Sequence, residues 1–259
     1  MNRKKFTILF YPQRPSKHST IYKIVKMLNY EIVNNPSKSH DLTIAWEDIT
    51  FRTSSLFNST SNSKVINGWC DDISKDKIDK EFRNIFNYST FIDPVTFTGR
   101  CVKKSNFNAT HDGKIIQCPI ESPEEGFVYQ KLVNNKNDLY GVYDIRTFII
   151  NGTIPFALIK LKKESKRFRD YYTLSIMRET QSIFTQEETD KIIQFCRNMG
   201  MDYGELDILR DSTDNRIYII DANNTPWWCS SLPEAESGPA LTILAEIFKK
   251  EFITYNNSL

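Results

Sequence analysis

Two apolar segments joined by a short polar turn, within residues 204–226, constrain this chain more than any other feature. The letters LDIL precede the turn DSTDN and RIYIID follows it, a pattern that predicts two strands in a hairpin. If the hairpin is centred on Asp214, Asp207 lies directly opposite Asp221, and Asn223 shares a face with Asp221 because side chains alternate along a strand. Two carboxylates and an amide oxygen are hard ligands of the kind that Mg²⁺ takes together with substrate phosphates. The alternative is an ordinary solvent-exposed hairpin with acidic residues near its turn.

Composition limits the classes of function open to this chain of 259 residues. The length suffices for two small domains or for one large domain with a substantial core. A formal net charge of +2 gives little support to nucleic-acid binding, so no nucleic-acid partner is expected. The five cysteines are scattered without a C-x-x-C pair, which favours a reduced, cytoplasmic protein over a zinc site or a disulfide framework. The apolar run near the N-terminus is too short for a signal peptide, and no membrane span is expected.

The first third of the sequence predicts a small α/β unit. An apolar run over residues 5–11 predicts a buried strand, and apolar residues at helical spacing after Ser19 or Thr20 predict a capped helix. Residues 30–33 and 42–46 predict two further short strands. The order of strand, helix and strand favours a βαβ unit with parallel strands.

A domain boundary is predicted near Asn87. Before it, the polar stretch at residues 53–64 predicts a loop, and apolar residues within 78–86 fall on one face of a helix. The boundary divides the chain into an N-terminal α/β domain, residues 1–87, and a second domain, residues 88–259.

The second domain is richer in strands. Extended segments are predicted at residues 99–104, 114–117, 127–132, 144–150 and 155–161. A helix over Gln186–Met199 is predicted from the capping box that Thr185 and Glu188 form, and it ends at Gly200. A final amphipathic helix is predicted over residues 239–252. Strands, then a helix, then a strand pair fit an α+β domain in which two subdomains clamp a ligand.

The hairpin resembles the metal-binding end of the ATP-grasp superfamily. In that family an acidic residue on one strand, and an acidic-x-Asn on the next, hold two Mg²⁺ ions against the phosphates of ATP. Asp207, Asp221 and Asn223 match this pattern, although the family more often has Glu where this chain has Asp221. The resemblance covers about residues 93–259. It implies an α+β, ATP-grasp fold of two α/β subdomains that clamp ATP, preceded by a small βαβ-type domain.

A second segment, CVKKSNFNATHDGKII, resembles the phosphate-binding part of this superfamily. A strand leads Lys103 and Lys104 into a small polar loop whose backbone N–H groups can hold phosphate oxygens. By resemblance Lys104 is the better match to the phosphate lysine, and Lys103 should point to the opposite face; both are candidate nucleotide ligands. The loop has only Gly113 where family members are often rich in glycine. His111 is either a hydrogen-bonding loop residue or a ligand of phosphate or substrate.

The segment VYQKLVNN resembles the link between the two subdomains, where the adenine sits. Backbone C=O and N–H groups at a strand exit can pair with the adenine edge. The candidate cofactor-binding residues are Gln130, Lys131 and Val133, with Asp138 for the ribose hydroxyls. The alternative is an amphipathic strand that leaves its sheet.

In the segment YDIRTFIINGTIPFALIKLKK, Asp144 and Arg146 share one strand face, as do Lys160 and Lys162. Because a guanidinium binds phosphate or carboxylate oxygens in a fork, Arg146 is predicted to be catalytic together with Lys104. Lys160 is a candidate nucleotide ligand. The alternative is a strand whose polar face meets water.

The basic run KKESKRFRDYY is the most basic segment of the chain. It resembles the family segment that reaches the γ-phosphate or an acidic substrate, with Arg167 and Arg169 as the candidates. A solvated turn is the alternative, as for most charge runs.

The resemblance implies an ATP-dependent carboxylate–amine ligase. A substrate carboxylate would attack the γ-phosphate and give an acylphosphate and ADP, and an amine would then displace phosphate to form an amide. ATP and Mg²⁺, two ions, are the implied cofactors. The acid would be a small sugar acid or amino-acid-like carboxylate, in the synthesis of a polysaccharide or a specialised metabolite.

Two other functions stay open: a kinase of the same fold that phosphorylates a hydroxyl of a sugar or small metabolite, and a domain that binds a nucleotide or glycan without catalysis. Trp227 and Trp228 follow the predicted metal-binding strand, so they are expected on the acceptor side, where their rings suit a sugar or an aromatic group; the alternative is that one or both pack in the core. Glu205 shares the face of Asp207 and could hold an amine. A homodimer is a further expectation, because many family members are dimers.

Overall fold

The computed structural model describes residues 5–53, 65–137, 141–169 and 172–254. Its strands are β1 (Thr7–Pro12), β2 (Glu31–Val33), β3 (Leu42–Trp46), β4 (Val65–Ile66), β5 (Gly99–Ser105), β6 (Lys114–Cys118), β7 (Phe127–Lys131), β8 (Lys136–Asn137), β9 (Gly141–Ile150), β10 (Ala157–Lys162), β11 (Leu174–Arg178), β12 (Tyr203–Arg210) and β13 (Ile217–Asn223). Its helices are α1 (Thr20–Met27), α2 (Lys75–Phe86), α3 (Thr180–Ile183), α4 (Gln186–Asn198), α5 (Glu234–Lys249), the 3₁₀ turn Glu164–Lys166 and the π turn Lys250–Thr254. Across these described residues, no helix has both the length and the apolar character needed to cross a membrane.

The N-terminal unit is a parallel sheet in the order β2-β1-β3-β4 with α1 beside it, as the βαβ pattern predicts. Ser19 caps α1, because its side chain accepts a hydrogen bond from the backbone N–H of Tyr22. Ile21, Ile24 and Val25 are buried. The helix and the strands predicted here from sequence are confirmed. Most of the loop predicted at residues 53–64 lies outside the described residues.

The helix before the predicted boundary, α2, packs on the second part of the chain. Phe82 of α2 lies in one buried core with Phe195 of α4 and with Ile219 of β13. The boundary near Asn87 stays a prediction. The helix α2 precedes this boundary, but its core contacts are with residues that follow it.

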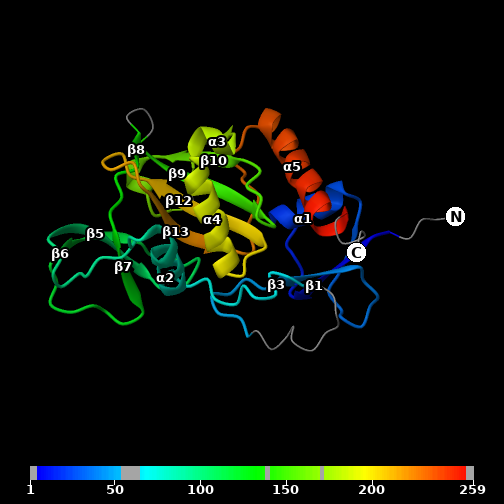
Figure 1. Cartoon of the computed structure of the whole chain (residues 1–259), viewed down its shortest axis with the longest axis horizontal. Helices are drawn as coiled ribbons and strands as arrows, with labels where there is room; N and C mark the ends of the chain where they lie inside the picture. The colour runs from blue at the N-terminus through cyan, green and yellow to red at the C-terminus, as the bar shows by residue number, and fades with distance from the viewer. Residues whose placement is uncertain (1–4, 54–64, 138–140, 170–171, 255–259) are drawn as a thin grey trace.

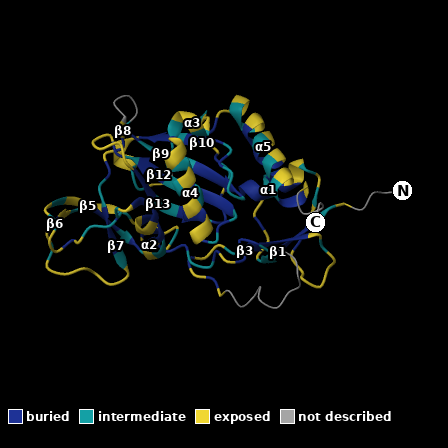
Figure 2. Ribbon diagram, in the orientation of Figure 1, coloured by how far each residue is buried: buried dark blue, intermediate teal, exposed yellow. Residues whose placement is uncertain are grey.

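The central element is a six-stranded antiparallel sheet in the order β11-β10-β9-β12-β13, with β8 paired to β9. Helices α2 and α4 cover one face, and their buried sides turn toward it (Figures 1 and 2). The capping box of Thr185 and Glu188 is present at the start of α4, as predicted.

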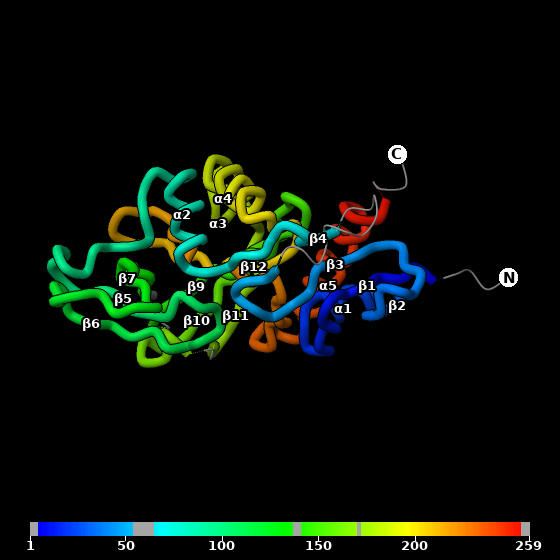
Figure 3. The backbone as a smooth tube through the Cα atoms, turned by 90° about the horizontal axis from the view of Figure 1, so that it is seen from below, coloured from blue at the N-terminus to red at the C-terminus, as the bar shows by residue number. Residues whose placement is uncertain are grey.

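The opposite face of the large sheet changes character along its strands. At one end Phe148, Leu158 and Tyr203 share a core with the N-terminal sheet and with α5. Further along the same face, β9 carries Arg146 and β12 carries Asp207. The view from below places the N-terminal unit at one end of this sheet and the strands β5, β6 and β7 at the other (Figure 3).

The small antiparallel sheet β6-β5-β7 completes the molecule. Four elements of the second part differ from the sequence prediction. The strands β8 and β11 and the helix α3 were not predicted, and α5 begins at Glu234 instead of Pro239. The extra turn of α5 places Glu234 and Glu236 at its N-terminus, where negative charge stabilises a helix.

Candidate functional site

A cavity of about 470 Å³ lies between the small sheet and the polar end of the large sheet. Side chains from β5, β7, β9, β10, β12 and β13 line it, together with the loop at residues 105–113. Most residues predicted from sequence to bind a nucleotide or a metal line this one cavity.

The hairpin of β12 and β13 has the register that the sequence predicts. Asp207 pairs directly with Asp221, and Glu205 pairs with Asn223. All four side chains line the cavity. A bulge after this point makes Ile220 an extra residue on β13, so that Ile220 and its neighbour Asp221 both line the cavity. Simple alternation would have separated them.

Asp207 is held by the guanidinium of Arg146. The Nε of Arg146 lies 3.2 Å from Asp207 Oδ1 and 2.7 Å from Glu205 Oε1. Burial acts to raise the pKa of Asp207, but the charges of Arg146 and Lys160 outweigh it and keep that pKa below its ordinary value. Glu205 is only 3% exposed and is paired with Arg146, which differs from the amine-binding role expected for it.

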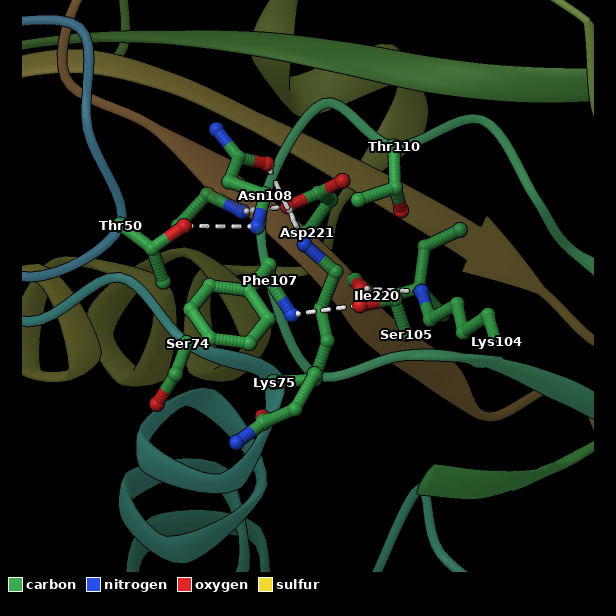
Figure 4. Close-up of polar contacts among 12 residues, drawn as sticks. Thr50, Ser74, Lys75, Lys104, Ser105, Phe107, Asn108, Thr110, Ile220 and Asp221 are labelled. Atoms are coloured by element: carbon green, nitrogen blue, oxygen red, sulfur yellow. Dashed lines mark hydrogen bonds and ion pairs between the residues drawn. The ribbon is translucent and has the colours of Figure 1, made fainter. Parts of the chain in front are cut away.

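Asp221 is held by Lys75, which sequence reasoning missed. Lys75 is the first residue of α2, is 3% exposed, and places its Nζ 2.8 Å from Asp221 Oδ1 and 3.2 Å from Asn108 Oδ1 (Figure 4). The only sequence signal is a lysine directly after the helix cap Ser74. That signal says nothing about a partner 146 residues away.

The loop at residues 105–113 is anchored on α2 and on the N-terminal unit. Asn106 accepts hydrogen bonds from two backbone N–H groups of the first turn of α2, those of Lys75 and Asp76. The backbone N–H of Asn108 donates to Thr50 Oγ1 at 2.8 Å. Ala109 and His111 both have positive φ, at 58° and 50°. Glycine would adopt this backbone conformation at a lower conformational free energy. His111 lines the cavity.

The two lysines of β5 point in opposite directions, as predicted. Lys104 lines the cavity, and its Nζ donates to the carbonyl oxygen of Ile220 at 2.9 Å. Burial lowers the pKa of Lys104 to about 8, against the opposing effect of the Asp221 charge. Lys103 lies outside the cavity lining, where its ammonium pairs with Glu124 over the ring of Phe127. Its predicted contact with a nucleotide is therefore not supported by its position.

The residues predicted for the adenine end line the cavity where β7 ends. Gln130 and Val133 are buried there, and Lys131 places its Nζ 2.8 Å from Asp211 and 2.7 Å from the hydroxyl of Tyr218. Val133 packs with Leu209 and Tyr218 in a small apolar cluster. Asp138 lies outside the described residues.

Further cations lie on β9, β10 and the segment after them. Lys162 pairs with Asp144 at 2.5 Å, and both line the cavity. Lys160 is buried beside the ring of Tyr172, 3.5 Å from its centroid, and burial lowers its pKa. It is not part of the cavity lining. Arg167 lines the cavity and donates to Asn135 Oδ1 at 2.5 Å, and Arg169 lines it with an exposed side chain.

The donor set of the hairpin meets the chemical requirements of Mg²⁺. Asp207 and Asp221 face each other on adjacent strands, and Asn223 presents its amide on the same face. All three supply hard oxygen, and phosphates could complete the ligand shell. No cluster of three His, Cys, Asp or Glu suited to a metal occurs among the described residues, so a metal here would depend on the amide of Asn223 and on substrate oxygens. The metal role of the three residues stays a prediction.

This chain superposes over most of its length on solved structures of ATP-grasp ligases, and it has the ATP-grasp fold. The relation rests on structure alone, because no family model and no curated protein sequence matches the chain.

Three solved structures illustrate the similarity. The ATP-grasp ligase PsnB complexed with a minimal precursor superposes with a TM-score of 0.59 at 12% identity, over 94% of this chain and 99% of that one. A D-alanine–D-alanine ligase from Bacillus anthracis gives 0.59 at 14% identity, over 98% and 99%. The macrocyclase MdnC with its precursor peptide MdnA, from Microcystis aeruginosa MRC, gives 0.54 at 11% identity, over 94% and 99%.

Proposed function

We propose that this protein is an ATP-dependent ligase that joins a carboxylate to an amine through an acylphosphate. The observation that carries the proposal is the face of the β12–β13 hairpin, where Asp207 lies opposite Asp221 and Asn223 follows on the same face. In one cavity, this face meets Lys104 and Arg146. Facing carboxylates with nearby cations suit phosphoryl transfer, in which catalysis consists mainly of positioning and charge stabilisation.

Each part of the cavity has its own role in this proposal. Val133 and the end of β7 would hold the adenine, and Lys104 and the 105–113 loop would hold the phosphates. Asp207, Asp221 and Asn223 would hold Mg²⁺, which when bound supplies positive charge to the phosphate oxygens. Arg146 is already oriented by Glu205 and Asp207, so its guanidinium can bind an acid or phosphate without first being ordered.

The reaction balances without another reactant. A carboxylate oxygen attacks the γ-phosphorus, the bond to the bridging oxygen of ADP breaks, and a carboxyl phosphate forms. The amine lone pair then attacks the acyl carbon, the C–O bond to phosphate breaks, and one proton leaves the nitrogen. Lys104 and Arg146 offset the negative charge that moves between these oxygens.

We further propose that the acid is an amino-acid-like carboxylate, either free or carried by a peptide. Two kinds of structural neighbour support this class: a ligase named for D-alanine, and two enzymes whose structures hold precursor peptides. The sugar acid inferred from sequence has no such support. The neighbours with bound ATP, or with Mg and ADP, support the cofactor assignment.

Hydroxylamine trapping tests the function directly. The full-length protein is incubated with Mg·ATP, hydroxylamine and pools of amino acids, uronic acids and short acidic peptides, and ADP and product masses are recorded. A hydroxamate formed together with ADP is the expected result, because hydroxylamine intercepts an acylphosphate. A product heavier by one phosphate, with no hydroxamate, would identify a kinase instead. No acid-dependent ADP from any pool would contradict the ligase assignment.

A further inference from the structure

Six carboxylates line the cavity, and two of them, Asp48 and Asp112, are exposed and have no ion pair within the described residues. Within the described residues, four pair with a lysine or arginine: Asp144, Glu205, Asp207 and Asp221. Asp112 belongs to the 105–113 loop, where its charge acts on Lys104. Asp48, which follows β3, has only the neutral hydroxyl of Thr225 on its Oδ1, at 3.1 Å. Among the described residues its carboxylate has no ion pair with a lysine or arginine.

Asp48 lies a short distance from the predicted metal ligands along a chain of hydrogen bonds. The hydroxyl of Thr225 donates to Asp48, and the backbone N–H of Thr225 donates to Asn223 Oδ1 at 2.9 Å. A group bound at Asp48 would therefore lie next to the place where the acylphosphate forms. This is the position that the attacking nucleophile of the proposed reaction must take.

An exposed aromatic ring lies at the same end of the cavity. Trp227 lines the cavity and keeps 57% of its surface exposed. The imidazole of His18 stacks on it, with 5.9 Å between ring centroids and 20° between planes. Its position is fixed by the backbone, because residues 18–20 and 226–228 exchange hydrogen bonds in both directions. A large ring that is both held in place and exposed is the kind of surface that binds a ligand.

We propose that Asp48 and Trp227 form the binding site of the amine substrate, and that this site selects a primary ammonium carried on an apolar stem. The inference rests on the proposed ligase function and names its nucleophile. The carboxylate binds the ammonium by a charge-assisted hydrogen bond. The indole adds a cation–π contact and covers the apolar stem.

This assignment replaces the role expected for Glu205. The carboxylate of Glu205 is buried against Arg146, so an amine could reach it only by displacing that guanidinium. Asp48 has no such competitor among the described residues. A neutral sugar ring would use Trp227 but would leave the charge of Asp48 without a partner.

The test measures ammonium binding by the full chain at pH 7. The probes are benzylammonium and Nα-acetyl-lysinamide, each compared with a neutral analogue of the same shape, benzyl alcohol and Nα-acetyl-norleucinamide. We expect each ammonium to bind at least tenfold more tightly than its analogue. Asp48→Asn and Trp227→Ala should each weaken ammonium binding at least fivefold, and Trp227→Phe should weaken it less.

Two matched variants serve as controls. Glu47→Gln removes the neighbouring carboxylate, and Trp69→Ala removes an exposed indole; neither residue lines the cavity. Both should bind the probes as the wild type does. Equal binding of ammonium and neutral probes, or unchanged binding in Asp48→Asn and Trp227→Ala, would overturn the assignment.

The two proposals fail in different ways. Hydroxylamine is too small to need an apolar platform, so Trp227→Ala should still form hydroxamate in the trapping assay. Hydroxamate without ammonium selectivity would overturn the amine site alone. Ammonium selectivity without hydroxamate would overturn the ligase function, and Asp48 and Trp227 would then be an ammonium-binding site that serves another reaction.

Discussion

At the scale of single residues, each aspartate predicted to bind Mg²⁺ is held by one cation. Arg146 holds Asp207, and Lys75 holds Asp221 from the start of α2. Both cations are largely buried, so leaving either one without its carboxylate would be costly. The pairs keep the two carboxylates in place before a metal arrives.

Asp221→Asn is expected to remove turnover while the fold is retained. An amide cannot supply the anionic ligand that Mg²⁺ needs, so we expect acid-dependent ADP release to fall about 10²–10³-fold, the range for losing one transition-state electrostatic contact. The amide oxygen can still accept a hydrogen bond from Lys75, but the buried ammonium of Lys75 loses its carboxylate, so the melting temperature should fall while the folded circular dichroism spectrum is retained. The control is Asp190→Asn on the surface of α4. Turnover near the wild-type rate in Asp221→Asn would contradict the metal assignment.

Nucleotide binding should weaken above pH 8 because of Lys104. Burial lowers the pKa of Lys104 from 10.5 to about 8, so above pH 8 the free protein loses the cation that would meet a phosphate. The affinity for Mg·ADP should then fall by up to about tenfold per pH unit, measured by calorimetry between pH 7 and 9.5. Between pH 8 and 10.5 the unfolded chain binds more protons at this site than the folded one, so the contribution of Lys104 to stability rises with pH. Unfolding therefore does not explain the loss.

The matched variant for this prediction is Lys104→Met. It should bind Mg·ADP more weakly at pH 7 and should lose most of the pH dependence. A wild type whose affinity stays constant to pH 9.5 would show that Lys104 does not meet the phosphates.

The sequence predicts the positions of those site residues that are fixed by residues close to them in the sequence. Asp207 faces Asp221 because a short turn sets the register of a hairpin. Lys103 and Lys104 point to opposite faces because successive side chains alternate along a strand. Lys75 could not be predicted, since its contact with Asp221 depends on how α2 docks on β13. Ile220 could not be placed either, because a bulge is not visible in the apolar pattern.

At the scale of elements, two segments that line the cavity contact each other. The loop at residues 105–113 is fixed to α2, and the segment after β10 approaches it from the large sheet. Gly113 lies against Phe168 so closely that a Cβ there would be 2.8 Å from the ring atom Cδ1. This contact joins the loop after β5 to the segment after β10.

Gly113→Ala is expected to disturb the contact between Gly113 and Phe168. The added methyl must displace the ring of Phe168, and overpacking of this kind costs about 1–3 kcal/mol. Because both residues line the cavity, displacing them should lower the affinity for Mg·ADP by at least about fivefold. The melting temperature should change little, because the contact lies outside the main cores.

The double variant Gly113→Ala with Phe168→Leu separates this explanation from a change in the loop backbone. A smaller side chain at residue 168 should recover much of the lost affinity, which is the non-additivity expected of residues in contact. Equal affinities in Gly113→Ala and the wild type would show that the two loops do not need to meet.

Helices and strands were predicted well where apolar residues recur at regular spacing or where a capping motif is present. The helix α4 follows from its capping box, and the strands β9 and β12 follow from alternating polar and apolar residues in the segments DIR and ELDI. The strand β11 was missed because LSIMR is short and mixed, and it is stabilised by pairing with β10. The start of α5 was placed too late because Pro239 resembles a first helical residue, whereas the helix continues for one turn before it.

At the scale of the whole molecule, the parts share cores across the boundary predicted at residue 87. The N-terminal sheet and α1 are packed against α5, and buried residues such as Ile24 and Phe248 belong to one cluster. On the other side of the large sheet, α2 contributes Phe82 to the cluster that includes α4. The N-terminal third therefore covers two apolar surfaces of the rest.

A fragment of residues 88–259 is expected not to fold as a cooperative unit. Removing residues 1–87 would uncover Phe195 on α4 and Phe248 on α5, both fully buried in the whole chain. The free energy lost by exposing these side chains is large compared with the small net free energy of unfolding of a domain. We expect the fragment to show no sharp thermal transition by circular dichroism and to bind a hydrophobic dye, whereas the whole chain unfolds cooperatively. A sharp transition near that of the whole chain would show that residues 88–259 are an independent domain. The shared cores would then be contacts between two domains that each fold alone.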